Sequence, residues 1–247
     1  MPIPHEDIIR MERCHVKAWP ALETRSIEGW HWRASGGGSQ RANSVSTVDF
    51  TGTDVTSALD GVESAYRARG LPARFHTFDA GSPADLPDVL RARGYTGTET
   101  TLTMFKPIER KSAPPDVEQY DHATPEWQEV YLGAVSENRR PVNARILAAI
   151  PEPRAFFACR REGRLISTAL SVTGYGCAVV ECVATREDVR RQGGAQAVLL
   201  ALEAWAAAQS VDLLGLQVVA TNTGAIILYE RLGFVVGATN RFWVRPV

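Results

Sequence analysis

The chain has 247 residues and a formal net charge of −1, with 45% apolar and 22% charged residues. Such a length fits one large domain or two of about 120 residues, and the composition is that of an ordinary globular protein. The near-neutral charge argues against a nucleic-acid or anionic-membrane partner, so we expect a small-molecule partner and a monomer or homodimer. No segment reaches the ~18 apolar residues of a membrane span. The charged N-terminus, four cysteines without a CxxC pair and scattered histidines predict a cytoplasmic protein without a metal site.

The first half contains the glycine-rich segment 35–44, which we predict to be a hairpin loop before a strand at 45–50. Residues 107–119 are rich in proline and charge and are typical of a linker. Residues 89–105 align with 228–244 at a constant offset of 139, which places Gly-Tyr on Gly-Phe. This internal repeat predicts two similar domains, 1–108 and 109–247.

The second half has clearer periodicity. Apolar residues at helical spacing predict helices over 124–136 and 142–150, and short turn sequences separate three strands. A helix after the next glycine loop, a strand, a further helix ended by a glycine, and a last strand complete an α/β layer arrangement. The three strands are predicted at 154–160, 164–172 and 177–184, the later helix at 223–232, and the last two strands at 214–219 and 241–246.

Residues 189–199, VRRQGGAQAVL, place two arginines and two glycines where a helix begins. The first turn of a helix leaves backbone N–H groups unpaired, and these attract anions together with the helix dipole. Glycine removes side chains that would hold a phosphate away from those amides. The stretch therefore predicts a pyrophosphate cradle. It matches neither the P-loop nor the dinucleotide fingerprint, and a surface turn with incidental arginines is the alternative.

Residues 181–202 resemble the acetyl-CoA-binding motif of the GNAT superfamily of N-acetyltransferases. Its Arg-x-x-Gly-x-Gly/Ala signature is met by Arg190, Gly193 and Ala195, and its second motif by NTGAIILYERLGF. Gly194 departs from the aliphatic residue usual in the family, which we expect to loosen the helix start. The resemblance implies a GNAT fold with a mixed, mostly antiparallel sheet flanked by helices, and acetyl-CoA as co-substrate. The cofactor contacts it implies are Val183, Ala184, Thr185, Arg190, Arg191, Gln192, Gly193, Gly194, Ala195, Gln196, Asn222 and Tyr229.

The resemblance also implies direct attack of an amine on the acetyl thioester. In the family, a backbone N–H at a bulge holds the thioester oxygen, which by position is that of Val183; a plain strand is the alternative. The family's general acid corresponds to Tyr229, whose alternative is a core aromatic role. Asn222 is a cofactor contact, a helix N-cap, or both.

Glu181 is the acidic residue on the strand that leads to the cofactor loop, and it shares a face with Val183. We expect burial to raise its pKa and make it the general base. The alternative is a paired, structural glutamate, with the base on a water chain that ends in the N-terminal half.

The first half has a GNAT-like tail without the cofactor signature, so we interpret it as a degenerate GNAT-like domain that walls off the acceptor cleft. The predicted function is acetyl transfer from acetyl-CoA to a primary amine of a small molecule. A non-catalytic acyl-CoA-binding module and a protein N-acetyltransferase are the alternatives.

Overall fold

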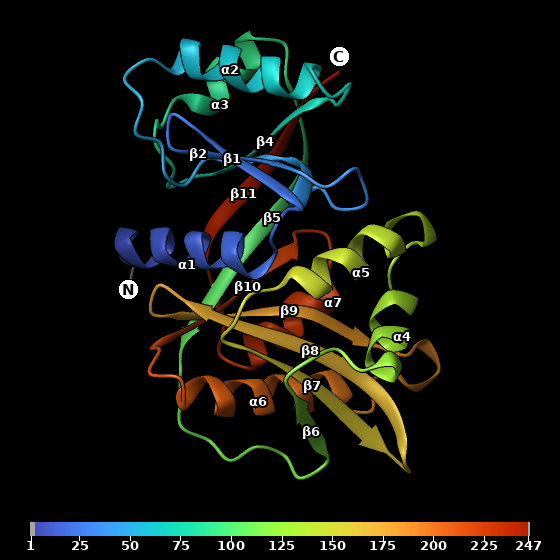
Figure 1. The fold of residues 1–247 in the computed structure, drawn as a ribbon. Helices are drawn as coiled ribbons and strands as arrows, with labels where there is room; N and C mark the ends of the chain where they lie inside the picture. The colour runs from blue at the N-terminus through green and yellow to red at the C-terminus, as the bar shows by residue number, and fades with distance from the viewer. Residues whose placement is uncertain (1–2, 247) are drawn as a thin grey trace.

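The computed structural model describes residues 3–246, and its first half begins with a helix that is followed by short strands (Figure 1). The predicted loop at 35–44 contains a 3-10 turn, and only two residues of the strand predicted at 45–50 are paired. The elements are α1 (His5–Ala18), β1 (Glu23–Ile27), β2 (Trp30–Ala34), β3 (Val45–Ser46), α2 (Val55–Arg67), β4 (Ala73–Phe78), α3 (Leu86–Ala92) and β5 (Thr96–Pro107).

In the second half, every predicted helix and strand is present, with two differences. A strand begins inside the predicted linker, and the last strand starts six residues earlier than expected because its first residues pair with Met104 and Phe105 of β5. The elements are β6 (Val117–Tyr120), α4 (Pro125–Gly133), α5 (Arg140–Ala149), β7 (Arg154–Arg161), β8 (Arg164–Gly174), β9 (Cys177–Thr185), α6 (Gly194–Ala207), β10 (Leu213–Val219), α7 (Thr223–Arg231) and β11 (Val235–Arg245).

One mixed sheet of eleven strands runs through both halves, in the order β1-β2-β3-β4-β11-β5-β10-β9-β8-β7-β6. Strand β5 lies between β10 and β11, although it belongs to the first half of the chain. Strand β11, from the second half, pairs with β4. The sheet therefore crosses the boundary predicted between residues 108 and 109 in both directions. The division into 1–108 and 109–247 stays a prediction about the chain, and in space the two halves exchange strands.

Equivalent residues of the sequence repeat have equivalent places in the structure. Thr101 of β5 pairs with Asn240 of β11, the residue 139 positions later. Gly94 and Gly233 end their helices with φ of +85° and +89°. Each donates its N–H to the carbonyl three residues earlier, and the next residue donates to the carbonyl five residues earlier. These equivalent bonds close both helices in the same way, as a left-handed glycine cap does.

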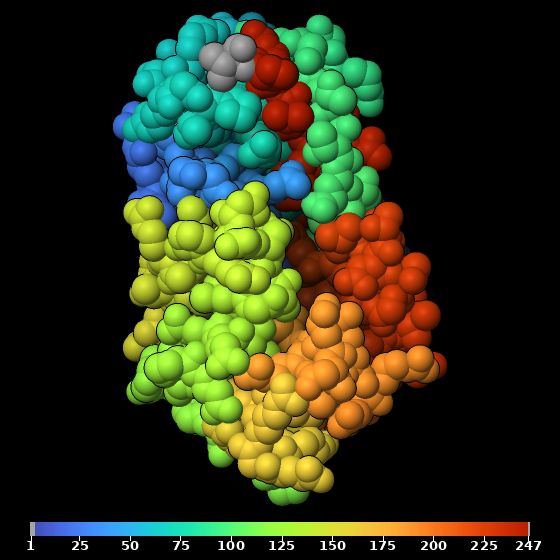
Figure 2. Space-filling view, turned by 90° about the vertical axis from the view of Figure 1, so that its right-hand side faces the viewer, coloured from blue at the N-terminus to red at the C-terminus, as the bar shows by residue number. Residues whose placement is uncertain are grey.

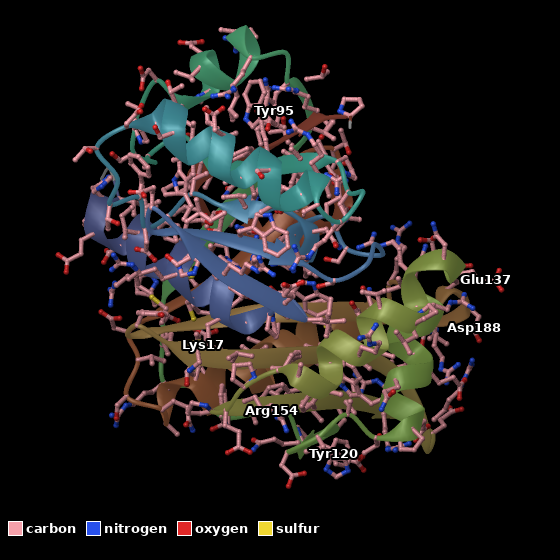
Figure 3. The ribbon with its side chains drawn as sticks, turned by 45° about the horizontal axis from the view of Figure 1, so that its top comes forward. Lys17, Tyr95, Tyr120, Glu137, Arg154 and Asp188 are labelled. Carbon is pink, nitrogen blue, oxygen red and sulfur yellow. The ribbon has the colours of Figure 1, made fainter. Side chains whose placement is uncertain are left out.

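Helices cover both faces of the sheet. Residues of α1, α4 and α5 pack in one core on one face of β7–β10, and α6 and α7 pack on the opposite face. Helices α2 and α3 cover the strands of the first half (Figure 1). At the C-terminal end of α1, Lys17 Nζ donates to Thr173 O of β8 at 2.7 Å (Figure 3). The first helix of the chain is thus part of the core of the second half.

A buried ion pair joins the exchanged strand to the second half. Lys106 of β5 and Glu203 of α6 lie 2.7 Å apart, and their side chains are 5% and 4% exposed. The Lys106 ammonium also donates to Leu232 O, and the Glu203 carboxylate accepts from the Glu109 N–H. Removing one partner of such a pair costs about 3–5 kcal/mol, because the other charge stays buried without compensation.

We expect residues 109–247 alone to lack a cooperative fold. Without β5, the strands β10 and β11 lose their shared partner, and Glu203 loses its cation. Circular dichroism during heating checks this result. As a control, the full chain cut once within the mostly exposed segment 108–116 keeps both pieces and should retain its transition. A sharp unfolding transition of the isolated 109–247 fragment contradicts the prediction.

Candidate functional site

The site begins where two parallel strands separate. The pairing of β9 with β10 runs from Cys177 and Leu213 to Val180 and Leu216, and ends there. Beyond this point the backbone of β9 continues to Thr185 beside an opening in the sheet. Such a gap between strands gives a ligand access to backbone groups that sheet pairing otherwise occupies.

A β-bulge lies at this opening. Between the pairs Thr168–Ala184 and Leu170–Glu181 the register of β8 and β9 shifts by one residue. Cys182 has a φ of +56°, in the left-handed region that non-glycine residues rarely adopt. Thr168 Oγ1 donates to Cys182 O at 3.2 Å and holds this geometry. The bulge predicted at Val183 is confirmed, and the plain-strand alternative is wrong.

The glycine loop leads into α6 without a side-chain cap. Gly193 is the N-cap residue, with φ of +81° and open space where a Cβ would stand. In the described residues no side chain bonds to the first-turn amides of this helix, whereas Asn222 caps α7 and Asp54 caps α2. Donors at the start of α6 are therefore left for an external acceptor.

Gly194 has a packing reason for its departure from the family pattern. A Cβ at this position would lie 2.3 Å from Ser167 Oγ and 3.0 Å from Ile166 Cδ1. Its lack of a side chain lets α6 approach β8 closely, and the expectation that this glycine loosens the helix start stays a prediction.

A groove of about 850 Å³ joins the loop, the bulge and α7. Figure 2 shows a hollow between the yellow-green surface of α4 and α5 and the orange-to-red surface of the glycine loop and α7. Eleven of the predicted residues lie together there, whereas Gln192 is exposed outside the lining and Glu181 lies elsewhere. Those in the lining are Val183, Ala184, Thr185, Arg190, Arg191, Gly193, Gly194, Ala195, Gln196, Asn222 and Tyr229.

Asn222 and Tyr229 of the second motif each have a structural contact and also line the groove. Asn222 Oδ1 accepts the Ala225 N–H at 3.2 Å, so it caps α7 and also lines the groove. Tyr229 is 8% exposed and packs edge-on against Phe234, yet its side chain also reaches the groove. Burial, with a smaller effect of the Glu181 charge, raises the pKa of Tyr229 to about 12. The phenol is therefore protonated at neutral pH.

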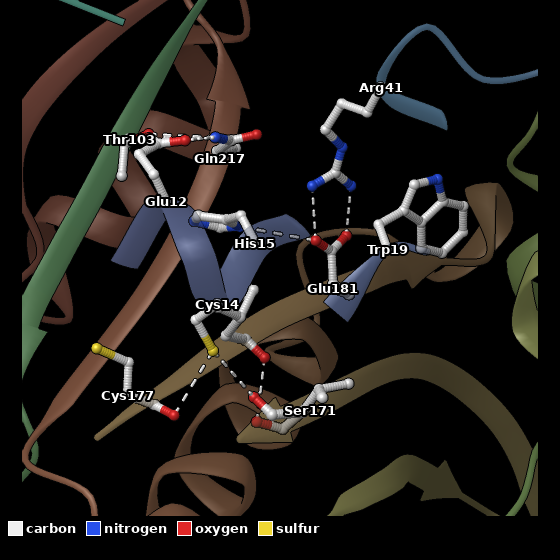
Figure 4. Close-up of polar contacts among 12 residues, drawn as sticks. Glu12, Cys14, His15, Trp19, Arg41, Thr103, Ser171, Cys177, Glu181 and Gln217 are labelled. Carbon is white, nitrogen blue, oxygen red and sulfur yellow. Dashed lines mark hydrogen bonds and ion pairs between the residues drawn. The ribbon is translucent and has the colours of Figure 1, made fainter. Parts of the chain in front are cut away.

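Glu181 is held in a buried ion pair, as the structural alternative predicted. Arg41 Nη1 and Nη2 donate to its two carboxylate oxygens at 2.7 and 2.6 Å (Figure 4). Burial alone would raise the pKa of Glu181, but the Arg41 charge, together with His15 and the Arg41 hydrogen bonds, lowers it to about 2. The expected rise in the pKa is therefore wrong, because a guanidinium from the other half faces the carboxylate.

A second cavity, of about 230 Å³, lies on the Arg41 side of the opening and takes residues from both halves. Aromatic, amide and charged side chains surround it. Its lining is Trp19, Ser39, Gln40, Arg41, Glu99, Thr101, Tyr131, Arg139, Gln217, Val219 and Phe242. Sequence reasoning missed Arg41 and His15, whose only local signals were an arginine in the glycine-rich loop and a histidine on an amphipathic helix.

A sequence model of the family described as "Probable histone acetyltransferase Rv0428c C-terminal" matches residues 6–243. The chain belongs to this family. It is an N-acetyltransferase of the GNAT superfamily, as the two motifs predicted.

Relatives of similar length extend the comparison. The "Uncharacterized N-acetyltransferase YobR" of Bacillus subtilis (strain 168) is 27% identical over 243 residues, which cover 93% of this chain and 95% of that protein. The GCN5-related N-acetyltransferase from Kribbella flavida has a TM-score of 0.70 at 19% identity, covering 97% and 95% of the two chains. A tandem GNAT protein from the clavulanic acid biosynthesis pathway has a TM-score of 0.66 at 12% identity, covering 99% and 97%. These structures confirm the GNAT fold, and the degenerate N-terminal domain stays a prediction.

No helix of residues 3–246 has the length and apolar character to span a bilayer. In the same residues, no three His, Cys, Asp or Glu side chains are grouped as metal ligands.

We expect Gly193→Val to weaken CoA binding by a few kcal/mol, because each charge-assisted bond from the loop contributes about 1.5–3 kcal/mol. Gly94→Val is the matched control, since Gly94 has nearly the same φ, +85°, and open space around its Cβ position. Both variants carry backbone strain of about 1–2 kcal/mol, which thermal denaturation measures. Calorimetry with CoA that gives equal affinities for the two variants contradicts the assignment of the loop.

Proposed function

We propose that the protein transfers an acetyl group from acetyl-CoA to a primary amine of a small molecule by direct attack. The observation that carries the proposal is the groove in which the uncapped start of α6, the bulge in β9 and Tyr229 converge. One groove thus contains an anion site, a backbone donor and a protonated phenol. A non-catalytic binding module would need only the first of these.

The residues of the groove fit a CoA thioester. The amides of the 193–196 turn and the guanidinium groups of Arg190 and Arg191 would hold the pyrophosphate. Ala184 and Thr185, on the separated part of β9, would line the pantetheine arm. The bound thioester supplies an activated acetyl group.

Two groups of this chain would stabilise the transition state. The Val183 N–H at the bulge would donate to the developing oxyanion, and a single donor of this kind contributes about 2.7–4 kcal/mol. The Tyr229 hydroxyl would donate to the departing sulfur. Since the pKa of Tyr229 is raised to about 12, this donor keeps its proton at neutral pH.

The cavity of about 230 Å³ beside Arg41 is the proposed acceptor site. Ligand pockets commonly have roughly 300–1,000 Å³, so this one suits a small amine. The family description raises a protein acceptor as the second candidate. The small size of the cavity and its lining from both halves of the chain favour the small molecule.

A single cofactor site is proposed for each chain. Helix α2 is the repeat counterpart of α6, and its start is capped by Asp54, whose carboxylate accepts from the Thr56 N–H at 2.9 Å and from Ser57 Oγ at 2.6 Å. That carboxylate takes the position an anion would need and repels it.

A panel of small primary amines and lysine-containing histone peptides, followed by free-thiol release from acetyl-CoA and mass spectrometry, tests the proposal. Acetylated small amines with a matching thiol yield support it. Modification of peptides alone would assign a protein acceptor. CoA binding without any acetylated product would leave only the binding module.

We expect Tyr229→Phe to lower kcat by roughly 10²-fold with little change in the KM for acetyl-CoA, because it removes the donor and keeps the ring packing. Tyr66→Phe is the control, since it deletes another buried hydroxyl, bonded to Arg33 O at 2.9 Å, in the other half. Steady-state kinetics and thermal denaturation of both variants check this. A kcat for Tyr229→Phe equal to that of the control would assign Tyr229 to the core alone.

A further inference from the structure

A buried histidine lies next to the Glu181–Arg41 pair. His15 of α1 is 3% exposed, and its Nδ1 is 3.8 Å from Glu181 Oε1 (Figure 4). Neither ring nitrogen has a hydrogen-bond partner among the described residues. A buried polar group without a partner costs about 1–3 kcal/mol. An imidazole that faces a carboxylate without a hydrogen bond of its own is a candidate for a role in the reaction.

A second carboxylate near His15 is already engaged. Glu12, one turn earlier on α1, accepts from Thr103 Oγ1 at 2.6 Å, Asn240 Nδ2 at 2.9 Å and Gln217 Nε2 at 3.1 Å. Figure 4 places His15 between this cluster and Glu181. Of the nearby carboxylates, Glu181 is therefore the one that faces the imidazole.

We propose that His15 accepts the proton of the acceptor amine through Glu181, which Arg41 fixes in place. This inference rests on the proposed function. The carboxylate of Glu181 is too weakly basic to keep the proton of an ammonium ion, whose ordinary pKa is about 10. An imidazole, with an ordinary pKa of about 6.5, is better matched to neutral pH.

The proposed path starts at the acceptor cavity, whose lining includes Arg41. It continues to Glu181, which is bonded to Arg41, and ends at His15; both are buried outside that lining. One N–H bond of the ammonium breaks, and a carboxylate oxygen of Glu181 takes the proton. That oxygen releases it as a new N–H bond forms at His15 Nδ1, so Glu181 returns to its charged form. The 3.8 Å separation must shorten for this transfer, as catalytic hydrogen bonds commonly do when a ligand binds.

The surrounding charges distinguish His15 from the neighbouring buried histidine. His76 of β4 has its pKa held well below the ordinary value by burial and by Arg33 and Arg41, so it stays neutral. His15 faces the carboxylate of Glu181, while Glu12 of its own helix adds a second negative charge nearby. A protonated His15 therefore has a counter-ion that His76 lacks.

Two measurements test the proposal. The first compares pH–rate profiles of wild type, His15→Gln and the control His31→Gln, a histidine paired with Asp49 at 3.0 Å in the same half. We expect His15→Gln to lower kcat by roughly 10²-fold and to lose the acidic limb of kcat/KM, with unchanged CoA affinity. His31→Gln should keep the wild-type limb. A His15→Gln enzyme with the wild-type rate and limb overturns the proposal.

The second measurement needs no active variant. Histidine NMR of the wild type and of Glu181→Gln at one pH should show that the His15 ring resonances shift in the variant, because the carboxylate that faces Nδ1 at 3.8 Å is replaced. The ring resonances of His31, which is paired with Asp49, should stay in place. His15 resonances that are unchanged in Glu181→Gln overturn the pairing. A wild-type protein that acetylates none of the amines in the panel would instead overturn the proposed function.

Discussion

The insertion of β5 between β10 and β11 is the constraint on which the rest of the structure depends. Because each half completes the sheet of the other, the halves are held in one orientation. That orientation lays α1 on β8–β10 and brings the loop at 35–44 over the end of β9. The Arg41–Glu181 pair, which joins residues 140 positions apart, exists only in this arrangement. The first half thus places a cation beside Glu181 of β9.

The site departs from regular structure in ways that a purely structural element would avoid. Helix α6 starts without a side-chain cap, and a typical cap stabilises a helix by about 1 kcal/mol. Cys182 is held in the left-handed region, at a cost of order 1–3 kcal/mol. The repeat counterpart of α6 restores its cap through Asp54. The two helices thus differ at their first turns, because α2 has a side-chain cap and the start of α6 has none.

Local patterns predicted the helices and most of the strands, because each rests on neighbouring residues. The start of α6 at a glycine loop and the cap of α7 by Asn222 are properties of single turns, and both were predictable. The strand exchange was not, since nothing in the pattern of β5 says which strand it joins. For the same reason, the sequence predicted that Glu181 is buried but did not indicate Arg41, its ion-pair partner. A pKa depends on the charges that the fold brings near, and Arg41 arrives from the other half.

The Glu181–Arg41 pair is better explained by function than by stability. Its lowered carboxyl pKa means that the pair stabilises the fold above the unfolded pKa of about 4.3, and that this contribution is lost as the pH falls toward 2. Yet apolar residues of similar volume often replace a buried pair at no loss of stability. Stability alone thus gives no reason to keep a charge 7% exposed beside an unpartnered imidazole. In the proposed relay, an anionic carboxylate fixed by Arg41 can accept a proton and pass it to His15, which an apolar pair could not do.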